Sequence, residues 1–96
     1  MSVIKVASKS DPNAVAWAII GALKDMQEVE VKAVGAAAIN QSIKAIAISR
    51  SELLKQNEDL ACAPSFTDVP MGNKIMTAIT LKVFKKSETI SNMSDM

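Results

Sequence analysis

The apolar and polar positions in the N-terminal part of the chain predict a strand, a helix and a second strand. Residues 2–8 alternate loosely and are rich in β-branched side chains, which is typical of a strand. Ser10 or Asp11 can cap a helix with Pro12 in its first turn, where proline is tolerated. Residues 29–34 alternate apolar and charged side chains, and a right-handed crossover makes this second strand parallel to the first. Helical spacing within the intervening segment predicts a buried stripe of Val15, Ile19, Ala22, Leu23 and Met26.

A second helix is predicted from Ala36 to Leu54, after a strand end at Gly35. One arc of this helix is apolar, and a neighbouring arc has Asn40, Lys44 and Ser51. The apolar arc is therefore the expected core face, and it consists of Ile39, Ile43, Ile46, Ala47 and Leu54.

The C-terminal part of the chain predicts a β-hairpin. Residues 60–67 form the third strand, in which Pro64 suggests an edge position or a bulge. Residues 68–74, with Pro70 and Gly72, are expected to form the turn, and residues 75–84 show the clearest strand pattern of the chain. The order is thus β-α-β-α-β-β. Because two helices can cover only one face of a four-stranded sheet, the other face either stays polar or is covered by a partner.

Composition is that of one folded domain, which we place at residues 1–84, followed by a flexible polar tail over residues 85–96. The 96 residues are 49% hydrophobic and 22% charged, which predicts a packed core. The net charge is +1, so any contact with phosphates must come from locally clustered lysines. Cys62 lies in an apolar run, and we expect a buried thiol and a reducing cytoplasm. No apolar stretch is long enough for a membrane span, and the N-terminal segment lacks the pattern of a signal peptide.

The residue types present argue against catalysis. The chain has no histidine and no tyrosine, and its single cysteine has no base beside it in the sequence. Asp68 is interpreted as a hydrogen-bond acceptor within the predicted turn. Gly35 alone does not match the spacing of a nucleotide-binding loop. We therefore expect no enzyme activity, no catalytic residue, no cofactor, no metal and no small-molecule substrate.

Three blocks of sequence resemble the stage V sporulation protein S family. They are residues 5–16 (KVASKSDPNAVA), residues 35–50 (GAAAINQSIKAIAISR), and residues 64–68 (PSFTD) followed by Gly72 and residues 77–79. The resemblance implies an Alba-like α+β two-layer sandwich, with a mixed four-stranded sheet and two helices on one face. It also implies a dimer that binds DNA or RNA and has a regulatory role in sporulation or a related developmental programme. In Alba proteins a basic loop after the first strand lies on the duplex and the hairpin reaches toward a minor groove. The corresponding parts here are Lys9 with Ser10, and the turn over residues 69–74.

The candidate nucleic-acid-binding residues are Lys9, Asn40, Lys44, Arg50 and Lys74. Asn40 and Lys44 offer an amide and a cation one helical turn apart, although a solvated helix face has the same pattern. Gly35 either lets a phosphate approach the helix N-terminus or simply turns the chain. Arg50 falls within the apolar arc, where its charge requires a partner: an intramolecular carboxylate, the helix C-terminal carbonyls, a phosphate or an acid of a dimer partner.

Two hypotheses for function remain at this point. The first is a non-enzymatic, dimeric regulator that contacts the phosphate backbone, since the few aromatic residues argue against base stacking. The alternative is a protein-protein interaction module on an Alba-like scaffold without significant nucleic-acid affinity. Trp17 and Ile20 lie outside the predicted stripe of the first helix, where they form either an exposed patch for association or part of a wide core face.

Overall fold

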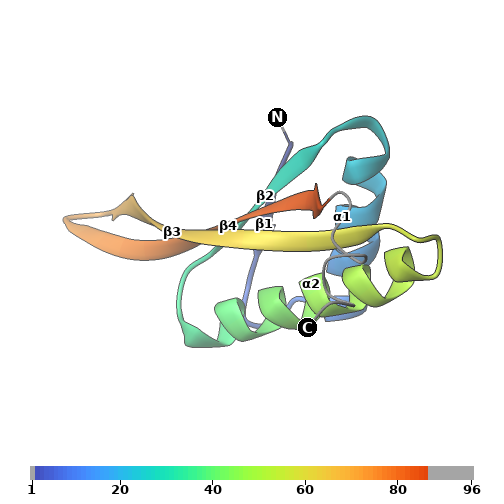
Figure 1. Cartoon of the computed structure of the whole chain (residues 1–96). Coiled ribbons are helices and arrows are strands. Elements are labelled where there is room, and N and C mark those ends of the chain that lie inside the picture. The colour runs from blue at the N-terminus through green and yellow to red at the C-terminus, as the bar shows by residue number, and fades with distance from the viewer. Residues whose placement is uncertain (1, 87–96) are drawn as a thin grey trace, which may run out of the picture.

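The computed structural model describes residues 2–86, which form four strands and two helices in the predicted order (Figure 1). The sheet order is β1-β2-β4-β3, with β1 parallel to β2 and the other neighbours antiparallel. The mixed four-stranded sheet and the crossover are thereby confirmed. The elements are β1 (Ser2–Val6), α1 (Pro12–Asp25), β2 (Glu28–Ala33), α2 (Ala36–Leu54), β3 (Asp59–Met71) and β4 (Lys74–Lys86).

Both helices begin where the sequence predicts. The Asp11 carboxylate caps α1 by accepting the Asn13 N–H at 3.0 Å, and Pro12 occupies the first turn. Gly35 precedes α2 with φ 92°, a left-handed conformation that favours glycine, so the predicted turn at this position is confirmed. No side chain caps the N-terminus of α2.

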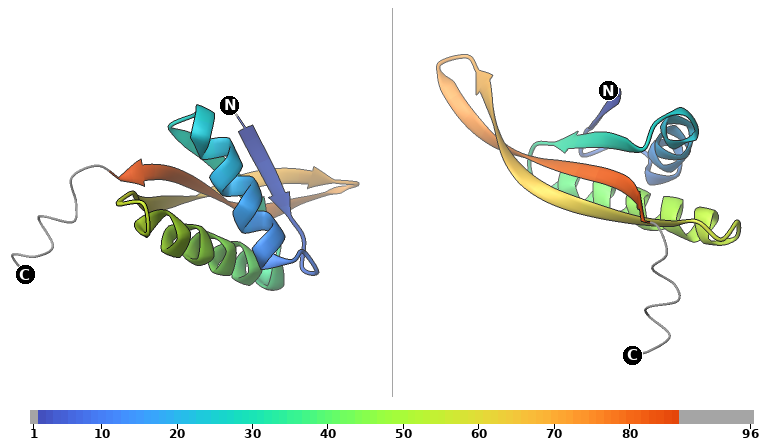
Figure 2. Two further views of the ribbon diagram at one scale, coloured as in Figure 1. Left: turned by 90° about the vertical axis from the view of Figure 1, so that its right-hand side faces the viewer. Right: turned by 45° about the horizontal axis from the view of Figure 1, so that its top comes forward.

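The core lies between the two helices and one face of the sheet (Figure 2). Val29 and Val31 of β2 are register partners of Val83 and Leu81 of β4, so all four point to the helix side, and all are buried. The opposite surface, which we call the open sheet face, has Lys5, Glu30, Lys32 and Lys82. These charged residues fit the polar alternative from the sequence, and the exposed Val3, which is the register partner of Glu30, lies on the same face. The core residues from α1 and α2 are Val15, Ala16, Ile19, Ile20, Leu23, Ala45, Ile46 and Leu53.

The predicted core face of α2 is confirmed at Ile46, which is buried, but most of the buried positions lie on a face rotated from the predicted one. Ile43 is 47% exposed and Leu54 is also exposed, whereas the buried positions are mostly small residues. Small side chains let α1 and α2 approach closely, and the hydroxyl of Ser49 lies 3.2 Å from the carbonyl oxygen of Ala16 across the helix pair. Because the two helices pack closely, small residues are buried on α2 where the sequence pattern predicted isoleucines. The small buried residues of α2 are Ala38, Ser42, Ala45 and Ser49.

Of the two alternatives for Trp17 and Ile20, the wide core face is confirmed for Ile20, which is buried. Trp17 is 60% exposed, so the two residues do not form a joint surface patch. The buried face of α1 is wider than the predicted stripe because it contacts both α2 and the sheet.

The hairpin is longer than predicted, and its turn is shorter. Residues 68–71 continue β3, and the turn is only Gly72 and Asn73, with Gly72 at φ 63° as expected for the first turn position of a two-residue hairpin. Asp68 therefore lies in a strand opposite Thr77 and is not a turn residue. The tip of the hairpin extends beyond both helices (Figure 2). We call its outer part, residues 64–79, the arm.

Strand β3 is an edge strand, as Pro64 predicted. Cys62 is exposed on this strand, which contradicts the expected buried thiol. Its register partner Val83 is fully buried in the adjacent strand. Within β3 only Asp59 and Leu60 are buried, so the helices cover the start of the edge strand and not Cys62. Of the predicted tail, Lys85 and Lys86 belong to β4, and residues 87–96 lie outside the described residues.

Candidate nucleic-acid interface

The loop that presents Lys9 is held by hydrogen bonds at both ends. The Ser10 N–H donates to the Ala7 carbonyl at 3.1 Å, and the Ala7 N–H donates to the Ser10 hydroxyl oxygen at 2.9 Å. The Gln41 side-chain amide on α2 donates to the Ser10 carbonyl oxygen at 2.9 Å in a partly buried position. Lys9 is exposed at the outside of this loop, so a defined backbone presents its ammonium group to solvent.

Gln41 connects the Lys9 loop to the turn of α2 that has Asn40 and Lys44. Both of these side chains are exposed. Because residues three and four apart share a helix face, Lys44 lies beside both Asn40 and Gln41. The structure therefore brings three of the five candidate residues into one region. Gln41 itself was not singled out from the sequence, where only its place inside the second family block distinguishes it.

Lys74 lies elsewhere, at the base of the two-residue turn opposite Met71. Lys74 is exposed, and the turn beside it is at the tip of the hairpin, which Figure 1 shows away from the two helices. A surface that included Lys74 and the Lys9 region would thus have to follow the arm along its length.

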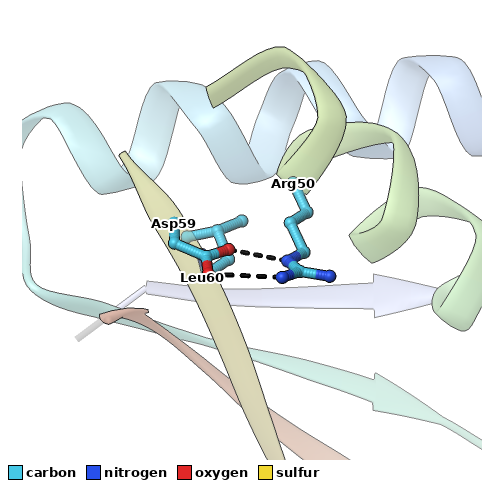
Figure 3. A network of polar contacts seen from close by, with 3 residues as sticks. All are labelled: Arg50, Asp59 and Leu60. Carbon is cyan, nitrogen blue, oxygen red and sulfur yellow. Dashed lines mark hydrogen bonds and ion pairs between the residues drawn. The ribbon is translucent and has the colours of Figure 1, made fainter. Parts of the chain in front are cut away.

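Arg50 has an intramolecular partner, which is one of the alternatives left open by the sequence. Its Nε donates to Asp59 Oδ1 at 2.6 Å, and its Nη2 donates to Asp59 Oδ2 at 3.3 Å (Figure 3). The Leu60 N–H donates to Asp59 Oδ1 at 2.7 Å. The Asp59 side chain is 2% exposed and that of Arg50 is 45% exposed. The pair therefore joins a buried carboxylate to a cation that reaches solvent.

These contacts shift the pKa values of both side chains in the direction that favours their charged forms. Hydrogen bonding to Arg50 lowers the pKa of Asp59, and this effect exceeds the opposing effect of burial. The hydrogen bond and the charge of Asp59 raise the pKa of Arg50. Arg50 is thus committed to Asp59 in the isolated chain, and its guanidinium is only partly available to a phosphate.

An apolar surface lies along the helix side of the arm. Phe66 is 80% exposed and Ile75 is 72% exposed, and the register places both on the same side as Leu81. Pro64, Phe66 and Ile79 line a shallow hollow on this part of the hairpin. Ile43 is exposed on the side of α2 that also has Arg50, which faces β3. We call Ile43, Pro64, Phe66, Ile75 and Ile79 the apolar arm surface.

Residues 2–86 show no cluster of three side chains suited to hold a metal ion. Neither α1 nor α2 has the length and apolar character that crossing a membrane requires.

The arrangement of elements is shared with Alba from Thermoplasma volcanium. The two structures superpose with a TM-score of 0.60, and the match covers 88% of this chain and 99% of that one. Sequence identity is 11%, so the likeness establishes the Alba-like fold alone.

The family comparison covers every residue that the structure describes. The family model for stage V sporulation protein S matches residues 2–86, from the first strand to the end of β4. All three blocks that suggested the resemblance lie inside this range. The chain belongs to the stage V sporulation protein S family.

Proposed function

We propose that the protein is a non-enzymatic nucleic-acid-binding regulator that acts as a homodimer in sporulation or a related developmental programme. The observation that carries the proposal is the hydrogen bond from Gln41 to Ser10, which holds the Lys9 loop against the turn of α2 with Asn40 and Lys44. Family membership and the Alba-like fold support the same function.

The proposed contacts are with phosphates. Lys9 and Lys44 supply cations, and the Asn40 amide supplies a neutral donor, the combination by which proteins hold a nucleic-acid backbone without reading bases. Lys74 on the arm provides a second, separate contact. Arg50 is left out of the first contact set because Asp59 holds its guanidinium.

The dimer is proposed to form through the apolar arm surface. Phe66 and Ile75 are large apolar side chains with most of their area in solvent, which is costly in a monomer and common where a partner docks. A second copy offers the same surface, so a two-fold contact would cover both sets of side chains at once. Such a dimer would have two Lys9 regions, which increases the number of phosphates that one assembly can contact.

A protein-interaction module is the second candidate, and the same apolar arm surface favours it, together with the net charge of +1. In that case a different protein covers Phe66 and Ile75, and nucleic acid does not bind. Co-purification of a stoichiometric protein partner that nuclease treatment does not release would support this candidate.

A salt titration tests the main proposal. Binding of the full chain to a labelled DNA duplex and to single-stranded DNA and RNA is measured by fluorescence anisotropy between about 50 and 200 mM salt. The expected result is binding that weakens steeply with salt. Lys9→Met and Lys44→Met should each reduce the slope of log K against log salt by about 0.7 to 0.9.

Lys24→Met is the matched control, because Lys24 is an exposed lysine at the other end of the helix layer, in the last turn of α1. It should leave the slope unchanged. Absence of binding to all three nucleic acids at the lowest salt would overturn the proposal.

A further inference from the structure

Two lysines stand side by side on the open sheet face. Lys5 of β1 and Lys32 of β2 are register partners in the parallel pair, so their side chains leave the sheet in the same direction from strands about 4.8 Å apart. Like charges directly opposite each other destabilise a sheet. Within residues 2–86, neither lysine forms an ion pair. The nearest acid along β2 on this face, Glu30, is in register with another lysine, Lys82.

The same two lysines line a hollow of about 400 Å³. Its other walls come from the end of β1 and the residues after it, from Val34 after β2, and from Val69 and Ala78 of the arm. The residues at and after the end of β1 are Val6, Ala7 and Ser8. The volume is within the range of sites that hold small organic ligands, and the lining has the usual composition of such sites, apolar walls with a few charged groups. Because the hollow lies between the arm and the strand ends, it requires the long β3-β4 hairpin.

We propose that this hollow binds a phosphate ester. The phosphate group lies between the ammonium groups of Lys5 and Lys32, and the organic group that is esterified to it packs against Val34, Val69 and Ala78. A phosphomonoester has close to two negative charges at neutral pH, which matches two adjacent cations that have no acid of their own. The apolar walls favour an ester over inorganic phosphate, because the ester has an organic group that can pack against them and the free ion has no such group.

The lysines of this site differ from those of the nucleic-acid interface, so the site does not rest on the proposed function. Two sources supply a phosphate next to an organic group: a free phosphomonoester, such as a nucleoside monophosphate, and the backbone of a nucleic-acid strand. A backbone phosphodiester has one negative charge, so the free phosphomonoester matches the two lysines more fully.

Phenyl phosphate is the probe, because it combines a phosphate with a compact apolar group. It is titrated into the isotope-labelled full chain, and the backbone amide signals of Ser8, Val34 and Val69 are followed by NMR. The expected result is saturable shifts at these residues, with inorganic phosphate binding at least about fivefold more weakly. Lys5→Met and Lys32→Met should each weaken phenyl phosphate binding by about tenfold, a loss of about 1.4 kcal/mol.

Lys82→Met is the matched control, since it removes a lysine from the same sheet face outside the hollow, and it should retain the affinity of the original chain. Val69→Glu is a second test that leaves both lysines in place: the acid introduced on the arm should pair with them and abolish binding. Circular dichroism establishes that each variant is folded.

Three results would overturn the site: binding that survives both lysine substitutions, equal affinity for phenyl phosphate and inorganic phosphate, or the absence of saturable shifts. Competition between a short oligonucleotide and phenyl phosphate would support the site and assign it to a strand backbone. Binding of phenyl phosphate without competition would support it and assign it to a free ester. Failure of the nucleic-acid proposal is seen separately, in the anisotropy titrations of Lys9→Met and Lys44→Met.

Discussion

Arg50 and Asp59 join the second half of α2 to the first residue of the edge strand β3, through hydrogen bonds of 2.6 and 3.3 Å. The carboxylate is buried and also accepts the Leu60 N–H, so it has three donors in all. This network fixes the start of an edge strand that has only β4 as a neighbour in the sheet.

Replacing Asp59 by asparagine should destabilise the fold. Asp59→Asn keeps the shape of the side chain but removes the charge that Arg50 and Leu60 N–H contact. We expect a loss of about 1 to 3 kcal/mol in the free energy of unfolding, with the lower part of the range favoured because Arg50 is partly solvated. Urea denaturation at neutral pH measures it. The control is Glu52→Gln, which removes an exposed pair with Lys55 and should cost less than about 1 kcal/mol.

The same carboxylate should make stability depend on pH on the acid side. The pKa of Asp59 is lower in the folded chain than in the unfolded chain, where it is about 3.9. The stabilisation is therefore fully present above that value and is lost as pH falls through the lower, folded pKa. The stability difference between the original chain and Asp59→Asn should be constant from pH 7 to about 5 and shrink below about pH 4. A difference that grew on acidification would contradict this interpretation.

Most helices and strands could be located from the sequence, because the residues that begin and end them lie within a few positions of the boundary. Asp11 and Pro12 mark the start of α1, and the α2 bounds, Ala36 to Leu54, coincide with the predicted ones. Pro64 correctly indicated an edge strand, since proline cannot donate a hydrogen bond to a second neighbour. The end of β3 was missed because Pro70 and Gly72 both resemble turn residues, whereas only Gly72 lies in the turn.

Features that depend on distant partners were harder to predict. Hydrophobicity predicts that Ile43 is part of the core. In the structure α1 approaches α2 closely, and the buried residues there are Ala45 and Ser49. The position of Arg50 predicts that it needs a partner, but Asp59 lies between the predicted second helix and third strand, where the sequence does not single it out from other acids. Gln41 contacts a carbonyl 31 residues away along the chain, a distance over which sequence spacing gives no information.

The close contact between α1 and α2 predicts a sharp difference between two neighbouring alanines. Ala45→Leu inserts a larger side chain where Ala45 is fully buried, and it should destabilise the fold by about 1 to 3 kcal/mol. Ala47→Leu is the control, because Ala47 is exposed on the same helix and should change stability by less than about 0.5 kcal/mol. Chemical denaturation of both variants tests the revised core face. Equal effects would contradict it.

The proposed dimer predicts that a charge on the apolar arm surface separates the subunits. Phe66→Glu should convert a dimer to a monomer in sedimentation equilibrium, because burying the new carboxylate without a partner is costly. Trp17→Glu is the control, since Trp17 is a large exposed apolar residue on α1, outside that surface. A dimer that survives Phe66→Glu but not Trp17→Glu would place the contact on α1.

Gln41 allows the positioning of Lys9 to be tested without changing any charge. Gln41→Met keeps the length of the side chain but removes the hydrogen bond to the Ser10 carbonyl oxygen, so the Lys9 loop is no longer attached to α2. We expect affinity for nucleic acid to fall about 2- to 10-fold. This corresponds to the loss of one neutral hydrogen bond, which contributes about 0.5 to 1.5 kcal/mol. The slope of log K against log salt should stay the same, because both lysines remain able to displace counterions.

The matched control for this substitution is Gln56→Met, because Gln56 is an exposed glutamine after the end of α2. It should leave both the affinity and the salt slope unchanged. If Gln41→Met instead lowered the salt slope as much as Lys9→Met, the loop would lose its phosphate contact altogether on release, and Gln41 would decide whether Lys9 binds at all. If it changed neither quantity, Lys9 would reach its phosphate from a free loop, and the Gln41–Ser10 hydrogen bond would serve the fold alone.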